Sequence, residues 1–215
     1  MAEDNRITQF VEKPEIGKAP SNLINAGIYV LSPEIFNYIP KGKKVSMERE
    51  IFPKLAQRGK LYGHKIKGLW IDIGKPEEYL QTNKIILDSI TKKQKPKNTS
   101  KYKTKIPIAL DKNVSIGEKS IIGPYGILGR NVTIGKNVQI SNTVIFPDTK
   151  IDDNSSINGA VIGEAATIGK NVKISKGCIV GDQAKIKDNI SLSKGTVVCP
   201  AKEVSDRTLK TKIIC

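Results

Sequence analysis

The chain has 215 residues, of which 38% are hydrophobic and 27% charged, and this balance predicts a soluble globular protein of one or two domains. A formal net charge of +15 raises the question of a nucleic acid or an anionic membrane as partner, but the position of the charges argues against both. The three cysteines are an odd number without paired spacing, so neither a disulfide framework nor a zinc site is indicated, and a reducing, cytoplasmic location is expected.

Residues 1–90 alternate between strand and helix patterns, which predicts an α/β fold. Strands are predicted at residues 7–11, 26–31, 61–66 and 69–73. Helices are predicted to begin at Ser32-Pro33, at Ser46 and at Pro76. We expect the second helix to break at Pro53 and to end at Gly59, and the third to run towards Ile90.

Residues 91–105 carry seven lysines and no acidic residue, nearly half of the excess charge, and we expect them to form a Lys-rich surface linker. Tyr102 is the only aromatic residue there, and no recognition motif accompanies it, so no nucleic-acid partner is expected. The N-terminus is polar, and the segment 22–33, which lies within the longest uncharged run, is too short to span a bilayer. We therefore expect no membrane partner.

Residues 106–200 carry an aliphatic residue at every sixth position, with two slips of one residue. The side chains predicted to point inward are Leu110, Ile116, Ile122, Leu128, Ile134, Ile140 and Phe146, then Ile151 and Ile157, then Ile162, Ile168, Ile174, Val180, Ile186, Leu192 and Val198. A mostly small or β-branched residue follows four positions later, and Lys150 is the clear exception. Glycine often follows the aliphatic residue, and asparagine stands at turn-like positions, which are residue types that tolerate a positive φ.

This pattern resembles the hexapeptide repeat of left-handed parallel β-helices, with about three hexads to a coil and coils stacked at about 4.8 Å. Cys178 falls in a small inward position and is predicted to be a packing residue. Residues 201–215 lie outside the repeat and are expected to form a C-terminal cap or tail. The only histidine, His64, lies outside the repeat, which argues against a hexapeptide-repeat acyltransferase and a trimeric carbonic anhydrase. The β-helix is therefore expected to be structural, and it predicts a homo-oligomer.

The first part of the chain contains three characteristic strings in this order: FVEKP at 10–14, NAGIY at 25–29 and WIDIG at 70–74. Together with EREIFP at 48–53 and KPEEYL at 75–80, they resemble the sugar-binding half of sugar-1-phosphate nucleotidyltransferases, closest to the mannose-1-phosphate guanylyltransferase group. A β-helix behind such a domain is also that family's arrangement. The resemblance implies a partial Rossmann-like nucleotidyltransferase domain at 1–90, followed by a left-handed parallel β-helix.

The resemblance also implies roles for individual residues. Lys13 would bind the sugar phosphate and act as the catalytic lysine, Glu12 would hydrogen-bond sugar hydroxyls, and Asn25 with Gly27 would shape the sugar pocket. Asp72 would hold Mg²⁺, a hard cation that prefers carboxylate oxygen. The substrates would be a sugar 1-phosphate and a nucleoside triphosphate, and the products a nucleotide sugar and pyrophosphate.

The family's nucleotide-binding part, with its Gly-rich phosphate loop, precedes the EKP-like string, which here begins at Glu12. We therefore expect a chain without the nucleotide-binding half, inactive alone, with an N-terminal fragment as its partner if the enzyme is split. A non-catalytic regulatory or assembly subunit is the alternative. The nucleotide and the choice between glucose and mannose stay open.

Overall fold

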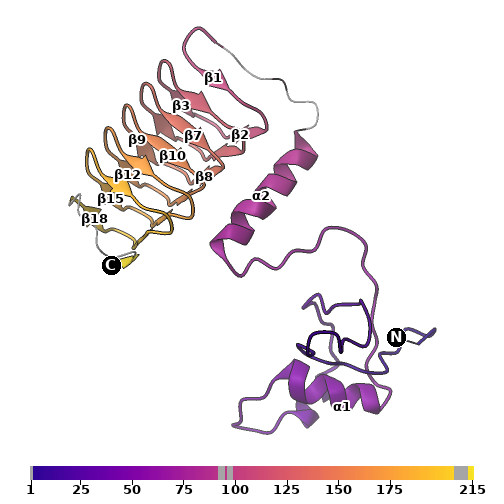
Figure 1. Ribbon diagram of the computed structural model, residues 1–215. Coiled ribbons are helices and arrows are strands. Elements are labelled where there is room, and N and C mark those ends of the chain that lie inside the picture. Colours follow the sequence, from indigo (N-terminus) through magenta and orange to yellow (C-terminus); the bar gives the residue numbers. More distant parts are fainter. Residues whose placement is uncertain (1, 92–94, 96–98, 206–212) are drawn as a thin grey trace. The chain divides into compact units, whose positions relative to one another are not determined.

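The computed structural model describes residues 2–91, 95, 99–205 and 213–215, and Figure 1 shows its elements. The chain divides into two compact units, residues 1–70 and 71–215. The helix predicted to begin at Pro76 therefore groups with the β-helix, whereas the predicted division at residue 90 had placed it with the preceding residues. No helix among the described residues is both long and apolar enough to cross a membrane.

The first unit contains both helical segments that were predicted for it. The first is η1 (Pro33–Tyr38), and the second consists of η2 (Met47–Ile51) followed directly by α1 (Phe52–Gln57). The Ser46 hydroxyl accepts a hydrogen bond from the Arg49 backbone N–H at 3.2 Å, which caps η2. Pro53 does not break the helix, because it lies in the first turn of α1, where a backbone N–H has no intrahelical acceptor. Gly59 follows the helix with φ of +64°, as a helix-ending glycine should.

The four strands predicted in residues 1–90 are not formed. Within the described part of this stretch, one antiparallel bridge joins Arg6 to Tyr62, and the Ile7 N–H donates to the Leu61 carbonyl at 2.8 Å. In the segment 26–31, Val30 is fully exposed. A strand needs a hydrogen-bonded neighbour along its length, and an apolar strand also needs cover on its faces, so local apolar runs alone do not make one.

Residues 103–204 and 213–214 form a parallel β-helix of three sheets, as the hexapeptide pattern predicted (Figure 1). The first sheet consists of β1 (Lys103–Thr104), β4 (Ile121–Ile122), β7 (Gln139–Ser141), β10 (Ser156–Asn158), β13 (Lys173–Ile174) and β16 (Ser191–Leu192). The second consists of β2 (Ile108–Leu110), β5 (Gly126–Leu128), β8 (Thr143–Ile145), β11 (Val161–Ile162), β14 (Ile179–Val180), β17 (Val197–Val198) and β19 (Ile213–Ile214). The third consists of β3 (Ser115–Ile116), β6 (Thr133–Ile134), β9 (Lys150–Ile151), β12 (Thr167–Ile168), β15 (Lys185–Ile186) and β18 (Glu203–Val204). Strands β18 and β19 lie beyond residue 200, so part of the expected tail continues the β-helix.

The interior of the β-helix is a stack of aliphatic side chains, almost all from the predicted positions. The prediction was wrong at Phe146, which is 37% exposed. Ile145 is 1% exposed, pairs with Leu128 and fills the inward position that was predicted for Phe146. The first slip thus comes one hexad earlier than predicted. The residue four positions after Ile145 is Thr149, which is buried, so the exception at Lys150 disappears. Leu110 keeps the predicted register but is 38% exposed, because β2 is the end strand of its sheet.

The corners of the coils follow two local rules. The expected asparagines, Asn113, Asn131, Asn137 and Asn171, all have positive φ. Most corner glycines do not; a Cβ on Gly117 would lie 2.5 Å from the Gly135 backbone, so close approach between coils is the reason for glycine.

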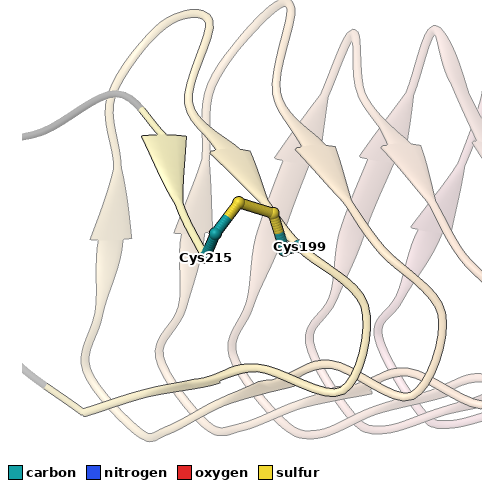
Figure 2. Close-up of a disulfide and its surroundings, with 2 residues drawn as sticks. All are labelled: Cys199 and Cys215. Carbon is teal, nitrogen blue, oxygen red and sulfur yellow. A yellow bond between two sulfur atoms is a disulfide. The ribbon is translucent and has the colours of Figure 1, made fainter.

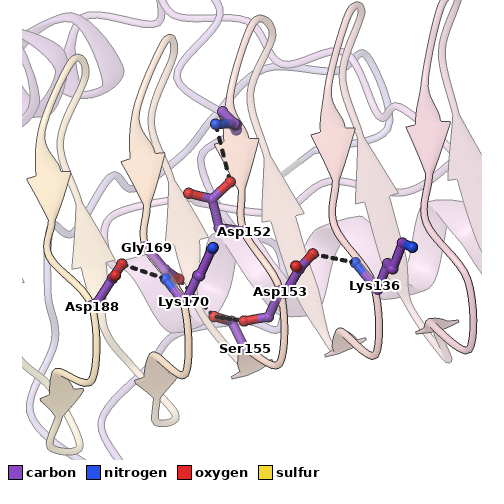
Figure 3. Close-up of polar contacts among 8 residues, drawn as sticks. Lys136, Asp152, Asp153, Ser155, Gly169, Lys170 and Asp188 are labelled. Carbon is purple, nitrogen blue, oxygen red and sulfur yellow. Dashed lines mark hydrogen bonds and ion pairs between the residues drawn. The ribbon is translucent and has the colours of Figure 1, made fainter.

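Aspartates connect successive coils at one corner (Figure 3). The Asp153 carboxylate accepts from the Lys136 backbone N–H and Asp188 from that of Lys170, each at 2.7 Å. The buried Ser155 hydroxyl donates to the Gly169 carbonyl at 2.8 Å. These bonds satisfy backbone groups that the strands leave unpaired at the corner.

Helix α2 (Pro76–Ile90) has the predicted bounds and carries Glu77 and Glu78 in its first turn. It lies along the β-helix, where the Lys84 ammonium stands 5.2 Å from the centre of the Tyr125 ring and the Tyr125 hydroxyl bonds Asp88 at 3.5 Å. The second sheet offers it an apolar outer row, formed in register by Ala109, Ile127, Val144, Val161, Ile179, Val197 and Ile213.

A disulfide joins Cys199 to Cys215, contrary to the sequence prediction (Figure 2). These residues directly follow the paired strands β17 and β19, so the parallel register brings their Cα atoms to 4.9 Å. Their spacing of 16 residues hid the pairing, since coils of the repeat have 17 or 18. Cys178 is buried as predicted, and burial raises the pKa of its thiol.

We predict that Ile168→Ala lowers the free energy of unfolding of the full chain by about 2–5 kcal/mol, measured by urea denaturation. Ile168 is completely buried and stacks between Ile151 and Ile186. The adjacent Thr167 points to the other face of β12, so Thr167→Ala should cost about 0.5 kcal/mol or less. A loss below about 1 kcal/mol for Ile168→Ala would contradict this packing.

We predict that Cys215→Ser accelerates hydrogen exchange of the Cys199 amide by about tenfold or more, because β19 loses its covalent link. That amide donates to the Ile214 carbonyl at 2.8 Å. The Gly181 amide, bonded to the Val198 carbonyl one coil earlier, is the internal control and should be unaffected. Equal exchange of the Cys199 amide in both proteins would show that the disulfide does not hold β19 in place.

Candidate functional site

Asn25 is the centre of a hydrogen-bonded cluster in the first unit. Its Nδ2 donates to the Tyr29 hydroxyl at 2.6 Å and to Glu48 Oε1 at 2.8 Å. The Tyr29 hydroxyl donates to the same Glu48 oxygen at 2.8 Å, and the Gly27 N–H donates to Asn25 Oδ1 at 3.0 Å. Two of the predicted pocket residues, Asn25 and Gly27, are thus brought together.

The cluster is anchored on the small core of the first unit. This core consists of Ile51, Phe52 and Leu55, with Phe10, Ile35, Tyr38, Ile39, Val45, Met47 and Leu61 packed around them. The Tyr29 and Phe10 rings meet the Phe52 ring edge to face, at centroid distances of 4.8 and 5.4 Å. Glu48 lies in η2, directly before this core, so burial of Phe52 fixes both sides of the cluster.

The backbone of the NAGIY string turns sharply between Asn25 and Tyr29. Gly27 has φ of +73°, a left-handed conformation that favours glycine. Its N–H donates to the side-chain oxygen of Asn25, Oδ1. The Trp70 indole N–H donates to the Ala26 carbonyl at 3.1 Å, so Trp70 supports this turn.

Burial and the neighbouring polar groups shift the pKa of Tyr29. Its pKa is raised above 10.0 first by burial and then by the hydrogen bond and charge of Glu48, while the bond from Asn25 lowers it. The charge of Glu12 raises the same pKa, which places this predicted sugar-binding carboxylate near the cluster. Glu12 is itself half-buried.

Lys13 follows Glu12 with an exposed side chain and φ of +51°. Among the described residues, Lys13 has no ion pair or hydrogen bond, so its ammonium group is accessible to an anionic ligand. A phosphate is the anion whose charge such a lysine would neutralise.

Asp72, the predicted magnesium ligand, lies in the second unit, exposed and just before α2. In the described part of the chain, no group of three or more His, Cys, Asp or Glu side chains is placed to hold a metal. Mg²⁺ is often bound through one or two carboxylates, substrate phosphates and water, so Asp72 fits as one ligand but does not form a metal centre by itself.

Glu48 and Tyr29 are the members of the cluster to which the sequence analysis gave no role, although both lie in the strings that it singled out. Tyr29 stands four residues after Asn25, and Glu48 stands before an apolar helix start. A carboxylate that is half-buried there requires a donor, and this requirement is the signal that could have found it.

Two family models match the chain. The nucleotidyl transferase model matches residues 1–89, and the GMPPB C-terminal domain model matches residues 104–214. The first includes the Asn25 cluster, and the second includes the β-helix.

Proteins with curated descriptions match over most of this chain. Mannose-1-phosphate guanylyltransferase 1 of Arabidopsis thaliana is 34% identical over 79% of the chain and 46% of its own length. The mannose-1-phosphate guanylyltransferase catalytic subunit beta of Drosophila pseudoobscura pseudoobscura is 41% identical over 80% and 46%. The chain thus spans about half the length of the curated relatives that it matches.

Among solved structures, the acetyltransferase domain of PglB from Neisseria gonorrhoeae FA1090 is 11% identical, with a TM-score of 0.26. The match covers 57% of this chain and 64% of that one. A likeness this weak carries no functional argument.

We predict that Glu48→Gln lowers the pKa of Tyr29 towards its ordinary value of 10.0, because the negative charge that disfavours the phenolate is removed. The pKa can be followed by NMR of ¹³C-labelled tyrosine as pH rises. Glu34→Gln is the control, since Glu34 bonds Ser32 and does not contribute to the shift of Tyr29. The same Tyr29 pKa in Glu48→Gln and the unaltered chain would contradict the contact.

Proposed function

Because the chain belongs to the mannose-1-phosphate guanylyltransferase family of nucleotidyltransferases, we propose that its first unit binds the sugar 1-phosphate substrate of that reaction. In the whole reaction, a phosphate oxygen of the sugar 1-phosphate attacks the α-phosphorus of a nucleoside triphosphate and expels pyrophosphate. Mannose 1-phosphate and GTP are the proposed substrates, by analogy with the mannose-1-phosphate guanylyltransferases that the chain resembles.

The Asn25 cluster is the observation that carries this proposal. The side chains of Asn25, Tyr29 and Glu48 are already fixed by mutual hydrogen bonds, and the Gly27 N–H donates to Asn25. The charge of Glu12 acts on Tyr29 of this cluster. Such preorganised polar groups bind sugar hydroxyls without first having to be ordered. Lys13, next to Glu12, supplies the positive charge that a sugar phosphate requires.

Catalysis of this reaction requires positioning and charge neutralisation rather than a nucleophile from the protein. We propose Lys13 as the catalytic lysine, binding the sugar phosphate, and Asp72 as a ligand of Mg²⁺. The magnesium ion would neutralise phosphate charge when bound. Residues 1–90 contain no Gly-rich phosphate loop, so we expect no turnover by this chain alone.

Two further parts of the proposal concern assembly and location. The β-helix serves as the assembly element of a homo-oligomer. An N-terminal fragment is the partner if the enzyme is split. A cytoplasmic location stays a prediction, although the disulfide removes the argument from unpaired cysteines.

We predict that the purified chain binds mannose 1-phosphate, measured by isothermal titration calorimetry, and that Lys13→Ala weakens this binding about tenfold through loss of a charge-assisted contact. Lys18→Ala is the matched control, since Lys18 is an exposed lysine paired with Glu15 and has no proposed role. No binding by the unaltered chain, or equal losses in both variants, would contradict the proposal.

The same protein tests turnover. With GTP, mannose 1-phosphate and Mg²⁺, we expect no pyrophosphate release from this chain alone. Coexpression with the N-terminal half of a relative should restore release if the chain is the sugar half of a split enzyme. Modulation of an already complete enzyme would instead support a regulatory subunit.

A further inference from the structure

We propose that Glu48 fixes the Asn25 amide so that only its carbonyl oxygen is offered to the substrate, and that the site therefore selects a sugar hydroxyl that donates a hydrogen bond. This inference rests on the proposed function, because it concerns how the proposed sugar pocket recognises the hydroxyl groups of its ligand. Glu48 is a positioning residue here, acting through Asn25.

The hydrogen bonds of Asn25 direct its amide nitrogen towards two acceptors of the protein. Its Nδ2 donates to Glu48 Oε1 at 2.8 Å and to the Tyr29 hydroxyl at 2.6 Å. The donor side of the amide is thus engaged within the cluster.

The carbonyl oxygen of Asn25 has the opposite status. It can accept two hydrogen bonds, and the Gly27 N–H at 3.0 Å uses one of them. One acceptor position remains, and only a donor on the ligand can occupy it.

Glu48 is the group that prevents the Asn25 side-chain amide from flipping. An ionised carboxylate accepts hydrogen bonds but cannot donate them, so a flipped Asn25 would point its carbonyl oxygen at Glu48. The Tyr29 hydroxyl donates its single proton to Glu48 and so accepts from Asn25. The three side chains thus specify one arrangement of donors and acceptors.

The position of Glu48 is itself fixed by the start of the helical segment. The Glu50 carboxylate accepts from the Ser46 N–H at 2.9 Å and the Ser46 hydroxyl caps η2, while Ile51 and Phe52 are 1% exposed. Glu48 therefore lies on a backbone that both capping and burial hold in place.

The test measures binding of mannose 1-phosphate and of analogues in which each free hydroxyl is replaced in turn by hydrogen or by fluorine. Fluorine cannot donate a hydrogen bond. For the hydroxyl that meets Asn25, we expect both replacements to weaken binding to the unaltered chain equally, by about tenfold. A hydroxyl that only accepts from the protein would tolerate fluorine better than hydrogen.

Variants separate positioning from folding. Glu48→Ala should weaken binding of mannose 1-phosphate about tenfold. It should also make the fluorine analogue bind better than the hydrogen analogue at the sensitive position, because the amide can then present its nitrogen to an acceptor. Glu34→Ala is the matched control, since Glu34 accepts a hydrogen bond from the Ser32 hydroxyl and has no contact with Asn25 or Glu48. It should keep the affinity and the analogue pattern.

A reciprocal pair provides the rescue. Asn25→Asp alone places two carboxylates in contact and should abolish binding, whereas Asn25→Asp with Glu48→Gln restores a donor facing the carboxylate and should recover binding. Binding by the unaltered chain with full affinity retained in Glu48→Ala, or failure of the rescue in a folded double variant, would overturn the inference alone. No binding by the unaltered chain would overturn the proposed function and this inference with it.

Discussion

The parallel stacking of like side chains is the constraint on which most of this structure depends. Each coil places its inward aliphatic residues against the residues at the equivalent positions of the next coil, as in the series Ile134, Ile151, Ile168 and Ile186. Because the strands are only two or three residues long, no strand is stable by itself, and burial between coils supplies the stabilisation. The corner residues follow from this spacing, since adjacent backbones come too close for a Cβ at Gly117.

The same constraint explains what could be predicted from the sequence. A repeated packing environment leaves a repeated pattern, so the β-helix and its inward residues were recognisable without a structure. The prediction was wrong where two residues competed for one position. Ile145 and Phe146 both fit an apolar slot by composition, but only Ile145 has the register with Leu128 and Ile162. At the C-terminal end the periodicity stops, and β19 with its disulfide depends on a pairing that no local pattern records.

Residues 1–90 were less predictable because their local patterns determine less of the structure. Caps and proline positions are local, so the helical segments beginning near Ser32, Ser46 and Pro76 formed as expected. Strand formation depends on neighbours, and none of the four predicted strands formed. For the site, the family resemblance named Asn25 and Gly27, but the role of Glu48 follows only from side-chain geometry across 23 residues of sequence.

This difference bears on how the two units hold their polar groups. In the β-helix, backbone amides donate to the preceding or following coil in regular order, so side chains at the corners are auxiliary. Around Asn25, backbone pairing is sparse, and the arrangement depends on side-chain bonds among Asn25, Tyr29 and Glu48. A network of this kind is sensitive to the loss of one member, because each remaining partner is left unsatisfied. The sugar pocket proposed here therefore gains its specificity from a few mutually dependent side chains, whereas the β-helix gains its stability from many equivalent ones.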